Sequence, residues 1–526
     1  MDTYRNFLAP TTVGYLNISN DSSEFDIQKF NEIGIQYFHY DIQKDQISNQ
    51  ISMMIHDIIH EDYFDENLYI IIQTDLDEEI LSKLISSLVT AGTLPIVLSK
   101  KTFFNYNSYT NLTISHEDFD TLLNCWSHFP QWKKPEPIAI PICCGDEVGN
   151  FPWITIKERI PDILEETIAV NKEWPHSYIQ SVLSIKKMML NSQLIENIPW
   201  KQHYPYLIVY LFTICVNREL YRKRNVMNTS WWFLEHYYFR YLLCVTDYYD
   251  RNIDIYHDPF LHMKENALKK IEPLMGDIFK DLIEEAKQYT HELPYSYFHL
   301  LILRSLWGNK ADLSMSCGKL EGDVFKDKSS LSNPHIIIFS DNTGLELLSD
   351  FIFIAIYLLL TPTGSVTYFI KENPVFVSDI TIHDVLYSIE WMKKHNCIQI
   401  SYIGTLIEQY YKEKRIIFKS EYQLNSCLDM WSISTNLYEY MNNCTLIISK
   451  GDANYRRFVG DRHWNYDIPV NKVLSYVPKP LLLLRTLKSN CLIGIDENQQ
   501  KEAKQFTEEW DVNGKIGIIQ YYQPSF

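Results

Sequence analysis

The feature that most constrains this sequence is a regular alternation in its C-terminal half. Short apolar runs occupy residues 335–339, 365–370, 445–448 and 480–484, and segments of helical length separate them. An apolar run of about five residues between turn signals is typical of a strand that is buried on both faces. Strands of this kind that alternate with helices predict a parallel sheet covered by helices on both sides.

Two other patterns precede this one along the chain of 526 residues. In residues 1–135, the apolar runs 68–73 and 94–98 flank a helical pattern at 77–90, which predicts a small α/β unit with a βαβ element. The proline-rich stretch KKPEPIAIP then predicts a linker, with a boundary near 133–140.

Helical periodicity dominates the middle of the chain. It is clearest at residues 160–169, 177–191, 231–246 and 264–289. Because a chain of this length exceeds one ordinary hydrophobic core, we expect several domains. They are a small α/β unit at 1–135, a helical domain at 140–300 and an α/β domain at 301–526.

Composition limits the partners and the location of the protein. A net charge of -18 disfavours nonspecific binding to nucleic acid or an anionic membrane, because clustered Lys and Arg hold such partners. The most apolar stretches, 206–216 and 351–360, are too short to span a bilayer, and the N-terminus lacks a signal peptide pattern. The ten scattered cysteines lack metal or redox spacing and favour reduced thiols. We therefore expect a cytoplasmic protein.

Polar side chains follow each predicted C-terminal strand. They include Asp341, Asn342, Asp379, Asp452, Arg456 and Lys488. In an open α/β sheet the ligand crevice lies outside the carboxyl ends of the strands, so these residues should converge.

The residue types at this edge indicate a metal and phosphate site. Asp341, Asn342 and Asp379 offer the hard oxygen ligands that suit Mg²⁺ or Mn²⁺. Lys488 and Arg456 would neutralise phosphate charge, and Asp452 is a candidate base or nucleophile.

Structural alternatives exist for several of these residues. An Asp before a helix often serves only as its N-cap, and Asn342 with the following Thr-Gly could form only a tight turn. Arg456 could lie on a solvated helix face. The segment LWGNKADLS at 306–314 could line the site or only fix a helix against the sheet.

Five segments together carry a family resemblance. They are LWGNKADLS at 306–314, DNTGLELLSD at 341–350, NPVFVSDITIHD at 373–384, KGDANYRRFVGDRHW at 450–464 and RTLK at 485–488. In these segments the chain resembles the metal-dependent damage-control phosphatases, whose eukaryotic stand-alone branch is also named acidic residue methyltransferase. With weaker similarity upstream, the resemblance covers about residues 140–526.

The resemblance implies a fold, a site and a substrate class. The implied fold is a helical layer joined to a Rossmann-like α/β/α sandwich, here preceded by the small α/β unit. The implied metal ligands are Asp341, Asn342 and Asp379. We also expect Asp341 and Asn342 to contact substrate, and Asp341 to take part in catalysis with Asp452 and Lys488. Further implied substrate contacts are Asp452, Ala453, Asn454, Tyr455, Arg456 and the motif lysine Lys488, with Asn309 as an additional candidate.

Family members of the Arg-Thr-x-Lys branch act on sugar phosphates such as fructose 1-phosphate and fructose 6-phosphate. The resemblance therefore implies a small phosphorylated metabolite as substrate and a divalent metal, Mn²⁺ or Mg²⁺, with Co²⁺ or Ni²⁺ as alternatives. Lys310 stands where many members have Arg, which changes the hydrogen-bonding geometry there. Residues 1–135 have no counterpart and could bind an unknown partner.

Two other functions compete with a phosphatase. The family's second name implies a methyltransferase that esterifies protein carboxylates with S-adenosylmethionine, but no glycine-rich G-x-G-x-x-G loop follows a predicted strand. A non-catalytic binding module is the other alternative, which the complete set of Asp, Asn and Lys candidates disfavours.

Overall fold

The computed structural model describes the strands within residues 12–114, helical positions 84 and 88, and most of residues 142–524. Gaps in the second part lie at 200–214, 221, 251–257, 273–280, 282, 287, 290–293, 307–315, 318–333 and 433–434. The predicted linker at 133–140, Asn309 and Lys310 therefore lie outside the described residues.

The N-terminal strands form a parallel sheet of the order β2-β1-β3-β4-β5. Its strands are β1 (Thr12–Asn17), β2 (Gln36–Asp41), β3 (Leu68–Gln73), β4 (Leu94–Leu98) and β5 (Leu112–Ile114). Strands β3 and β4 coincide with the two predicted apolar runs. The helix expected at 77–90 is described only at Leu84 and Leu88, which are helical and buried.

Helices follow from residue 151 onward. They are α5 (Phe151–Ile154), η2 (Thr155–Arg159), α6 (Ile160–Val170), α7 (His176–Leu190), α9 (Trp231–Val245), α10 (Leu261–Ile271) and α12 (Tyr295–Leu306). Polar caps explain two starting points, because Asn150 accepts from the Trp153 amide and Ser230 from the Phe233 amide. The expected helices at 160–169, 177–191 and 231–246 are confirmed to within a residue. Of the pattern at 264–289, α10 accounts for the first part.

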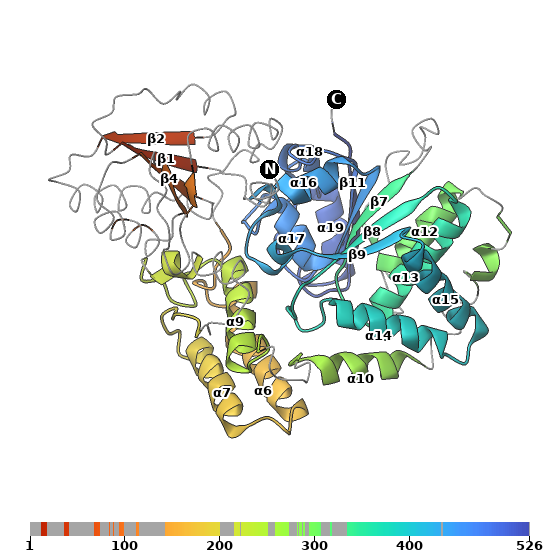
Figure 1. Ribbon diagram of the computed structural model, residues 1–526, viewed down its shortest axis with the longest axis horizontal. Helices are drawn as coiled ribbons and strands as arrows, with labels where there is room; N and C mark the ends of the chain where they lie inside the picture. Colours follow the sequence, from red (N-terminus) through yellow and green to blue (C-terminus); the bar gives the residue numbers. More distant parts are fainter. Residues whose placement is uncertain are drawn as a thin grey trace. The chain divides into compact units, whose positions relative to one another are not determined.

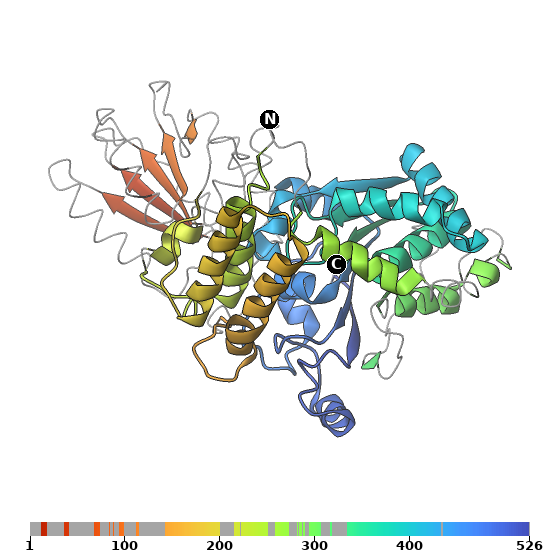
Figure 2. The same ribbon diagram turned by 90° about the horizontal axis from the view of Figure 1, so that it is seen from below.

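The C-terminal part of the chain is an α/β sandwich with a seven-stranded sheet of the order β6-β12-β11-β10-β7-β8-β9 (Figures 1 and 2). The strands are β6 (Ser316–Cys317), β7 (His335–Phe339), β8 (Ser365–Ile370), β9 (Ile416–Ser420), β10 (Leu446–Lys450), β11 (Leu481–Thr486) and β12 (Gly517–Tyr522). The helices are α13 (Leu345–Leu360), α14 (Ile382–Lys393), α15 (Ile398–Lys412), α16 (Thr435–Asn442), α17 (Gly451–Val459), α18 (Val470–Val473) and α19 (Glu497–Phe506), with short turns η5 (Tyr422–Asn425) and η6 (Met430–Ser432).

Both faces of this sheet are buried, and alternate side chains of a strand point to opposite faces. Ile336 and Ile338 of β7 lie in the core that α12, α13, α14 and α15 cover. Phe339 faces the other side, where its ring meets Phe458 of α17 edge to face with a centroid distance of 5.6 Å. A strand covered on both faces must be apolar at nearly every position, which explains the continuous apolar runs.

The chain reverses its direction across the sheet at β7. From β7 it moves outward through β8 to β9, and it then returns to the opposite side of β7 as β10, followed by β11. The switch point therefore lies between the adjacent parallel strands β7 and β10.

The predicted α/β architecture is confirmed, with two differences in the sheet. Strands β6, β9 and β12 were not expected, and β12 pairs antiparallel with β11. By its contacts the chain separates into two compact units: 1–157 with 184–254 and 428–439, and 158–183 with 255–427 and 440–526. The domain boundaries expected from the sequence stay predictions.

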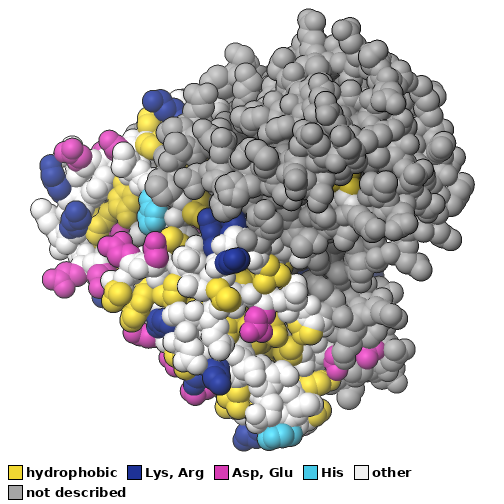
Figure 3. All heavy atoms as spheres, turned by 90° about the vertical axis from the view of Figure 1, so that its left-hand side faces the viewer, with side chains coloured by type: hydrophobic (Ala, Val, Ile, Leu, Met, Phe, Trp, Pro, Cys, Tyr) yellow, Lys and Arg dark blue, Asp and Glu magenta, His cyan; other side chains and the backbone are white. Residues whose placement is uncertain are grey.

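No helix among the described residues is long and apolar enough to cross a bilayer. On the face that Figure 3 shows, Lys and Arg side chains lie interspersed with Asp and Glu among the described residues. The cytoplasmic location stays a prediction.

Candidate active site

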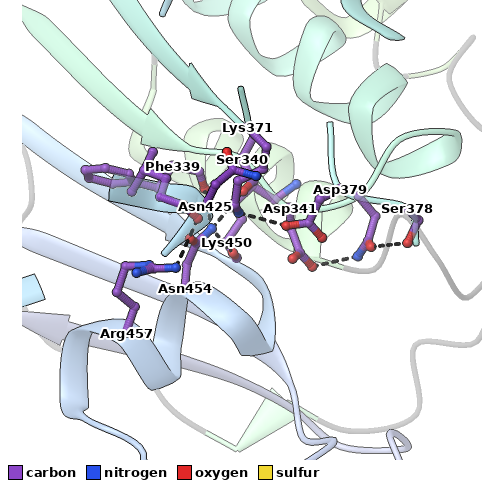
Figure 4. Close-up of polar contacts among 12 residues, drawn as sticks. Phe339, Ser340, Asp341, Lys371, Ser378, Asp379, Asn425, Lys450, Asn454 and Arg457 are labelled. Carbon is purple, nitrogen blue, oxygen red and sulfur yellow. Dashed lines mark hydrogen bonds and ion pairs between the residues drawn. The ribbon is translucent and has the colours of Figure 1, made fainter. Parts of the chain in front are cut away.

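The carboxyl end of β7 carries the first two candidate ligands, and the loop after β8 brings in the third. Asn342 pairs with Asp379 in an isolated antiparallel bridge. Backbone hydrogen bonds on both sides fix this bridge: the Thr343 amide donates to Ser378, at 2.8 Å, and the Ile380 amide donates to Asp341, at 3.1 Å. The structure therefore brings Asp341, Asn342 and Asp379 together, and Figure 4 shows Asp341 and Asp379 beside each other.

The loop that delivers Asp379 has an unusual backbone. Phe376 and Val377 adopt positive φ values of 50° and 67°. A β-branched residue such as Val is strained in this left-handed region, and such strain persists only where surrounding contacts hold it. Strained residues of this kind cluster at functional sites, so the turn supports the assignment of the loop to a site.

Gly451 lets β10 and α17 approach Asp341 closely. Its φ is +86°, and a Cβ added there would lie 2.0 Å from Cγ and Oδ2 of Asp341. Only glycine satisfies both the conformation and the space. The Asp341 carboxylate therefore lies against the first residue of α17, at the switch point between β7 and β10.

Buried lysines accompany these carboxylates from neighbouring strands. Lys371, directly after β8, lies 2.7 Å from Oδ2 of Asp379. Lys450, the last residue of β10, pairs with Glu346 at 3.1 Å and with Asp350. Glu346 in turn accepts a 3.1 Å hydrogen bond from Nδ2 of Asn342. Each of these buried lysines thus lies next to a buried carboxylate, which lowers the cost of burying both charges.

These lysines do not fully offset the cost of negative charge on the buried carboxylates of Asp341 and Asp379. Burial, followed by the charges of Glu346 and Asp379, raises the pKa of Asp341 well above its ordinary value, while Lys488 and Lys371 act in the opposite direction. Burial also raises the pKa of Asp379, although Lys371 opposes this. Negative charge at the two carboxylates is therefore incompletely compensated within the protein.

Lys488 and Asp452 lie after β11 and in the first turn of α17. Lys488 is half-buried and makes no hydrogen bond or ion pair with any residue that the structure describes. Asp452 is held in place: its Oδ1 lies 2.8 Å from Nη2 of Arg485 and accepts from Ser489 at 3.1 Å. Arg485 is buried and stacks on the Tyr455 ring at 4.2 Å.

Asn454, Tyr455 and Arg456, which follow in α17, also have side chains engaged within the protein. Asn454 donates to the backbone oxygens of Ser340 and Lys450 at 2.7 and 2.9 Å, which ties the ends of β7 and β10 together (Figure 4). The Tyr455 hydroxyl accepts from Ile493 at 3.2 Å.

Arg456 makes a two-pronged ion pair with buried Asp461 at 2.9 and 3.0 Å. Its exposure on a solvated helix face is thus excluded, and its guanidinium lies 4.0 Å from Asp452. The half-buried Ala453 contributes only backbone and a methyl group. The substrate roles of residues 452–456 stay predictions.

Sequence reasoning assigned no role to four buried residues that support the site: Lys264, Glu346, Lys371 and Lys450. Lys371 and Lys450 stand at the carboxyl ends of β8 and β10, so the rule that selected Asp341 could have found them. Glu346 lies in the first turn of α13, four residues after Asn342, and its carboxylate reaches Nδ2 of Asn342. Lys264 has no such signal, because it lies far away in the sequence.

The donor set fits a hard divalent cation. Among the described residues, no three His, Cys, Asp or Glu side chains form a cation cluster. The candidate donors are the carboxylates of Asp341 and Asp379 and the amide oxygen of Asn342, which accepts here from the Ser378 hydroxyl at 2.5 Å. Oxygen donors of this type suit Mg²⁺ and Mn²⁺. A divalent cation would also relieve the repulsion that raises the pKa of Asp341.

The fold and the site together define an α/β protein whose doubly wound sheet carries buried carboxylates and lysines at its switch point. The model of the damage-control phosphatase ARMT1-like domain matches residues 155–503, which is well over half of the chain. The chain belongs to this family, and the resemblance found in its five sequence segments is confirmed.

Relatives of similar length support this assignment. The damage-control phosphatases ARMT1 of Macaca fascicularis and Homo sapiens are both 28% identical over 439 residues, covering 72% of this chain and 98% of theirs. The Bos taurus protein is 26% identical, with 72% and 97% covered. The match to a solved DUF89 family protein from Pyrococcus horikoshii covers 63% of this chain and 90% of that one at 14% identity, with a TM-score of 0.32.

Proposed function

We propose that this chain is a divalent-metal-dependent phosphomonoesterase that acts on small phosphorylated metabolites. Sugar phosphates such as fructose 1-phosphate and fructose 6-phosphate are the candidate substrates. The observation that carries the proposal is the pair of buried carboxylates, Asp341 and Asp379, at the switch point of the sheet. Membership of a damage-control phosphatase family supports the same reaction.

The candidate site residues divide into ligands of the metal and groups that act on the phosphate. Asp341, Asn342 and Asp379 would hold Mn²⁺ or Mg²⁺, and Co²⁺ or Ni²⁺ would suit the same donors. The cation would supply Lewis-acid polarisation of the phosphoryl group. Lys488, whose charge acts on Asp341, would stabilise the negative charge that develops on the phosphoryl oxygens.

Asp452 has two candidate roles in the reaction. As a base, it would take a proton from the water that attacks phosphorus; as a nucleophile, it would attack phosphorus itself. With Asp452 as base, the ester P–O bond breaks as water adds to phosphorus, and the proton taken from that water passes to the leaving oxygen of the metabolite. With Asp452 as nucleophile, the ester bond breaks as the carboxylate adds and the leaving oxygen takes a proton from water; a second water then displaces the carboxylate from phosphorus. The ion pair with Arg485 at 2.8 Å fixes the carboxylate and favours a role that depends on orientation.

Phosphate release from a panel of sugar and nucleotide phosphates tests the proposal. The protein is first stripped of metal with a chelator and then assayed with Mg²⁺, Mn²⁺, Co²⁺ or Ni²⁺. We expect turnover only with added metal and the highest kcat/KM on a sugar phosphate. A parallel assay of methyl transfer from labelled S-adenosylmethionine to protein carboxylates separates the alternative. Methyl transfer without phosphate release would refute the phosphatase.

A further inference from the structure

We infer that Lys264 is a positioning residue for Asp379: from helix α10 it holds the backbone of the strained turn that carries this carboxylate. The inference rests on the proposed metal site. Lys264 lies 115 residues before Asp379 in the sequence, and its ammonium donates a 3.1 Å hydrogen bond to the Asp379 backbone oxygen. Nothing in the proposed chemistry requires Lys264 to touch the substrate.

The surroundings of Lys264 fix its ammonium in one place. The residue is 5% exposed and donates to Oδ2 of Asp258 at 2.9 Å and to Oδ2 of Asp384 at 2.8 Å. Together with the Asp379 oxygen, these acceptors use all three donors of a lysine ammonium. The position of the Asp379 carbonyl is thereby tied to α10.

Both carboxylates around Lys264 are themselves held by backbone groups. Asp258 accepts from the Phe260 amide at 2.8 Å, just before α10. Asp384, in the first turn of α14, accepts from the amide and hydroxyl of Thr381 at 2.8 and 2.9 Å. The network therefore joins the start of α10 to the start of α14, on the C-terminal side of Asp379.

We expect this network to fix the position of Asp379 and to add little to the stability of the fold. A buried ion pair contributes little net stability, because desolvation offsets the attraction between its charges. In contrast, the positive φ values at Phe376 and Val377 need contacts that hold the loop. Lys371 holds the carboxylate of Asp379 and Lys264 holds its carbonyl, so the two lysines fix this residue from both ends.

Loss of Lys264 should therefore weaken metal binding more than the chemical step. Groups that orient a metal ligand typically change metal affinity by about 10- to 100-fold when they are removed. Saturating metal would restore the same donors to the same places, so kcat should then remain within about threefold of the wild type.

The test is calorimetric titration of Mn²⁺ alone into chelator-treated full-length protein. The main variant combines Lys264→Met with Asp384→Asn, which removes one charge of each sign and keeps the net charge of the cluster, while Asp258 loses its ion pair but keeps the hydrogen bond from the Phe260 amide. Lys393→Met is the matched control, because Lys393 on α14 pairs with Glu390 and Glu408. Asp384→Asn alone is the milder variant, which keeps Lys264.

We expect Mn²⁺ to bind the double variant at least tenfold more weakly than the wild type, with Lys393→Met unchanged. Asp384→Asn alone should weaken binding by about two- to fivefold, and it decides the question if the double variant does not fold. Unchanged Mn²⁺ affinity in a folded Lys264 variant, even with a lower melting temperature, would overturn the inference. Absence of Mn²⁺ binding by the wild type would instead overturn the proposed metal site and the inference with it.

Discussion

Asn342, the Ile380 amide and Gly451 all lie against Asp341. Its carboxylate accepts from Nδ2 of Asn342 at 2.6 Å, and its backbone oxygen accepts from Ile380. The same carboxylate leaves no space for a side chain at position 451. Its raised pKa shows that the charged form is disfavoured in the metal-free fold.

Replacing Asp341 with Asn should stabilise the metal-free protein and abolish its response to metal. A folded-state pKa above the unfolded value means that the charged carboxylate costs stability at neutral pH, so we expect Asp341→Asn to raise Tm by about 2 °C at pH 7.5. This gain should shrink as the pH falls, because protonated Asp341 then resembles Asn. Thermal melts with and without Mn²⁺ measure both effects.

The control for this prediction is Glu502→Gln on the exposed side of α19, which should melt like the wild type in both conditions. An Asp341→Asn protein that Mn²⁺ stabilises as strongly as the wild type would contradict the ligand assignment.

Substitution of Lys488 should impair catalysis and spare metal binding. A positioned charge that acts on the transferred phosphoryl group is worth about 10²-fold or more in kcat/KM, so we expect a loss of that size for Lys488→Ala. Lys488→Arg should recover little, because the guanidinium is larger and planar. Steady-state kinetics on the best sugar phosphate provide the measurement, with exposed Lys472→Ala as the matched control. Near-wild-type kinetics for Lys488→Ala would remove this residue from the mechanism.

Position after a strand was sufficient to select several site residues from the sequence. Asp341, Asn342 and Asp379 follow buried strands, and the structure places them together. The inward direction of Tyr455 and Arg456 was not predictable in this way, because it depends on which side of α17 packs against the sheet. Lys264 could not be found either, since only the folded chain brings α10 to the Asp379 turn.

Among the helices and strands, the site depends on how closely the start of α17 approaches the end of β7. The strands that frame this approach were predictable, because strands covered on both faces are apolar throughout. Edge strand β9 was missed, since only one of its five residues is buried. The strained turn at Phe376 and Val377 was also unpredictable, because side chains like these disfavour the conformation they adopt.

Gly451→Ala should push the start of α17 away from Asp341 at the end of β7. The added Cβ would meet the Asp341 carboxylate at 2.0 Å and would also strain a backbone with φ of +86°. The matched control is Gly149→Ala, where φ is +88° and no atom lies within 4 Å of the added Cβ. Both variants should lose about 1–2 kcal/mol of stability through backbone strain.

Only Gly451→Ala should lose Mn²⁺ binding and phosphatase activity, as titration calorimetry and phosphate release would show. If both variants retained Mn²⁺ affinity, the close approach of Gly451 and Asp341 would have no importance for the site.

At the scale of the whole molecule, all described candidate residues belong to one of the two compact units. Asp341, Asp379, Asp452 and Lys488 lie in the unit of residues 158–183, 255–427 and 440–526. The N-terminal sheet lies in the other unit, together with residues 184–254. The described candidate residues therefore lie in a different compact unit from the N-terminal strands.

A fragment of residues 138–526 should consequently retain Mn²⁺ binding and the chemical step. We expect kcat within about threefold of the full chain, because the fragment contains every described candidate residue. An insoluble fragment would show that residues 1–137 complete a folding unit with 184–254. A soluble fragment that binds Mn²⁺ but has lost activity would assign the N-terminal unit a direct part in catalysis.

Anomalous X-ray scattering from crystals grown with Mn²⁺ tests the central claim most directly. Data collected near the manganese absorption edge would locate the bound ion without reference to activity. We expect one strong peak at the switch point between β7 and β10, about 2.2 Å from carboxylate oxygens of both Asp341 and Asp379. A strong peak at another set of residues, or no peak at a Mn²⁺ concentration that supports phosphate release, would contradict it.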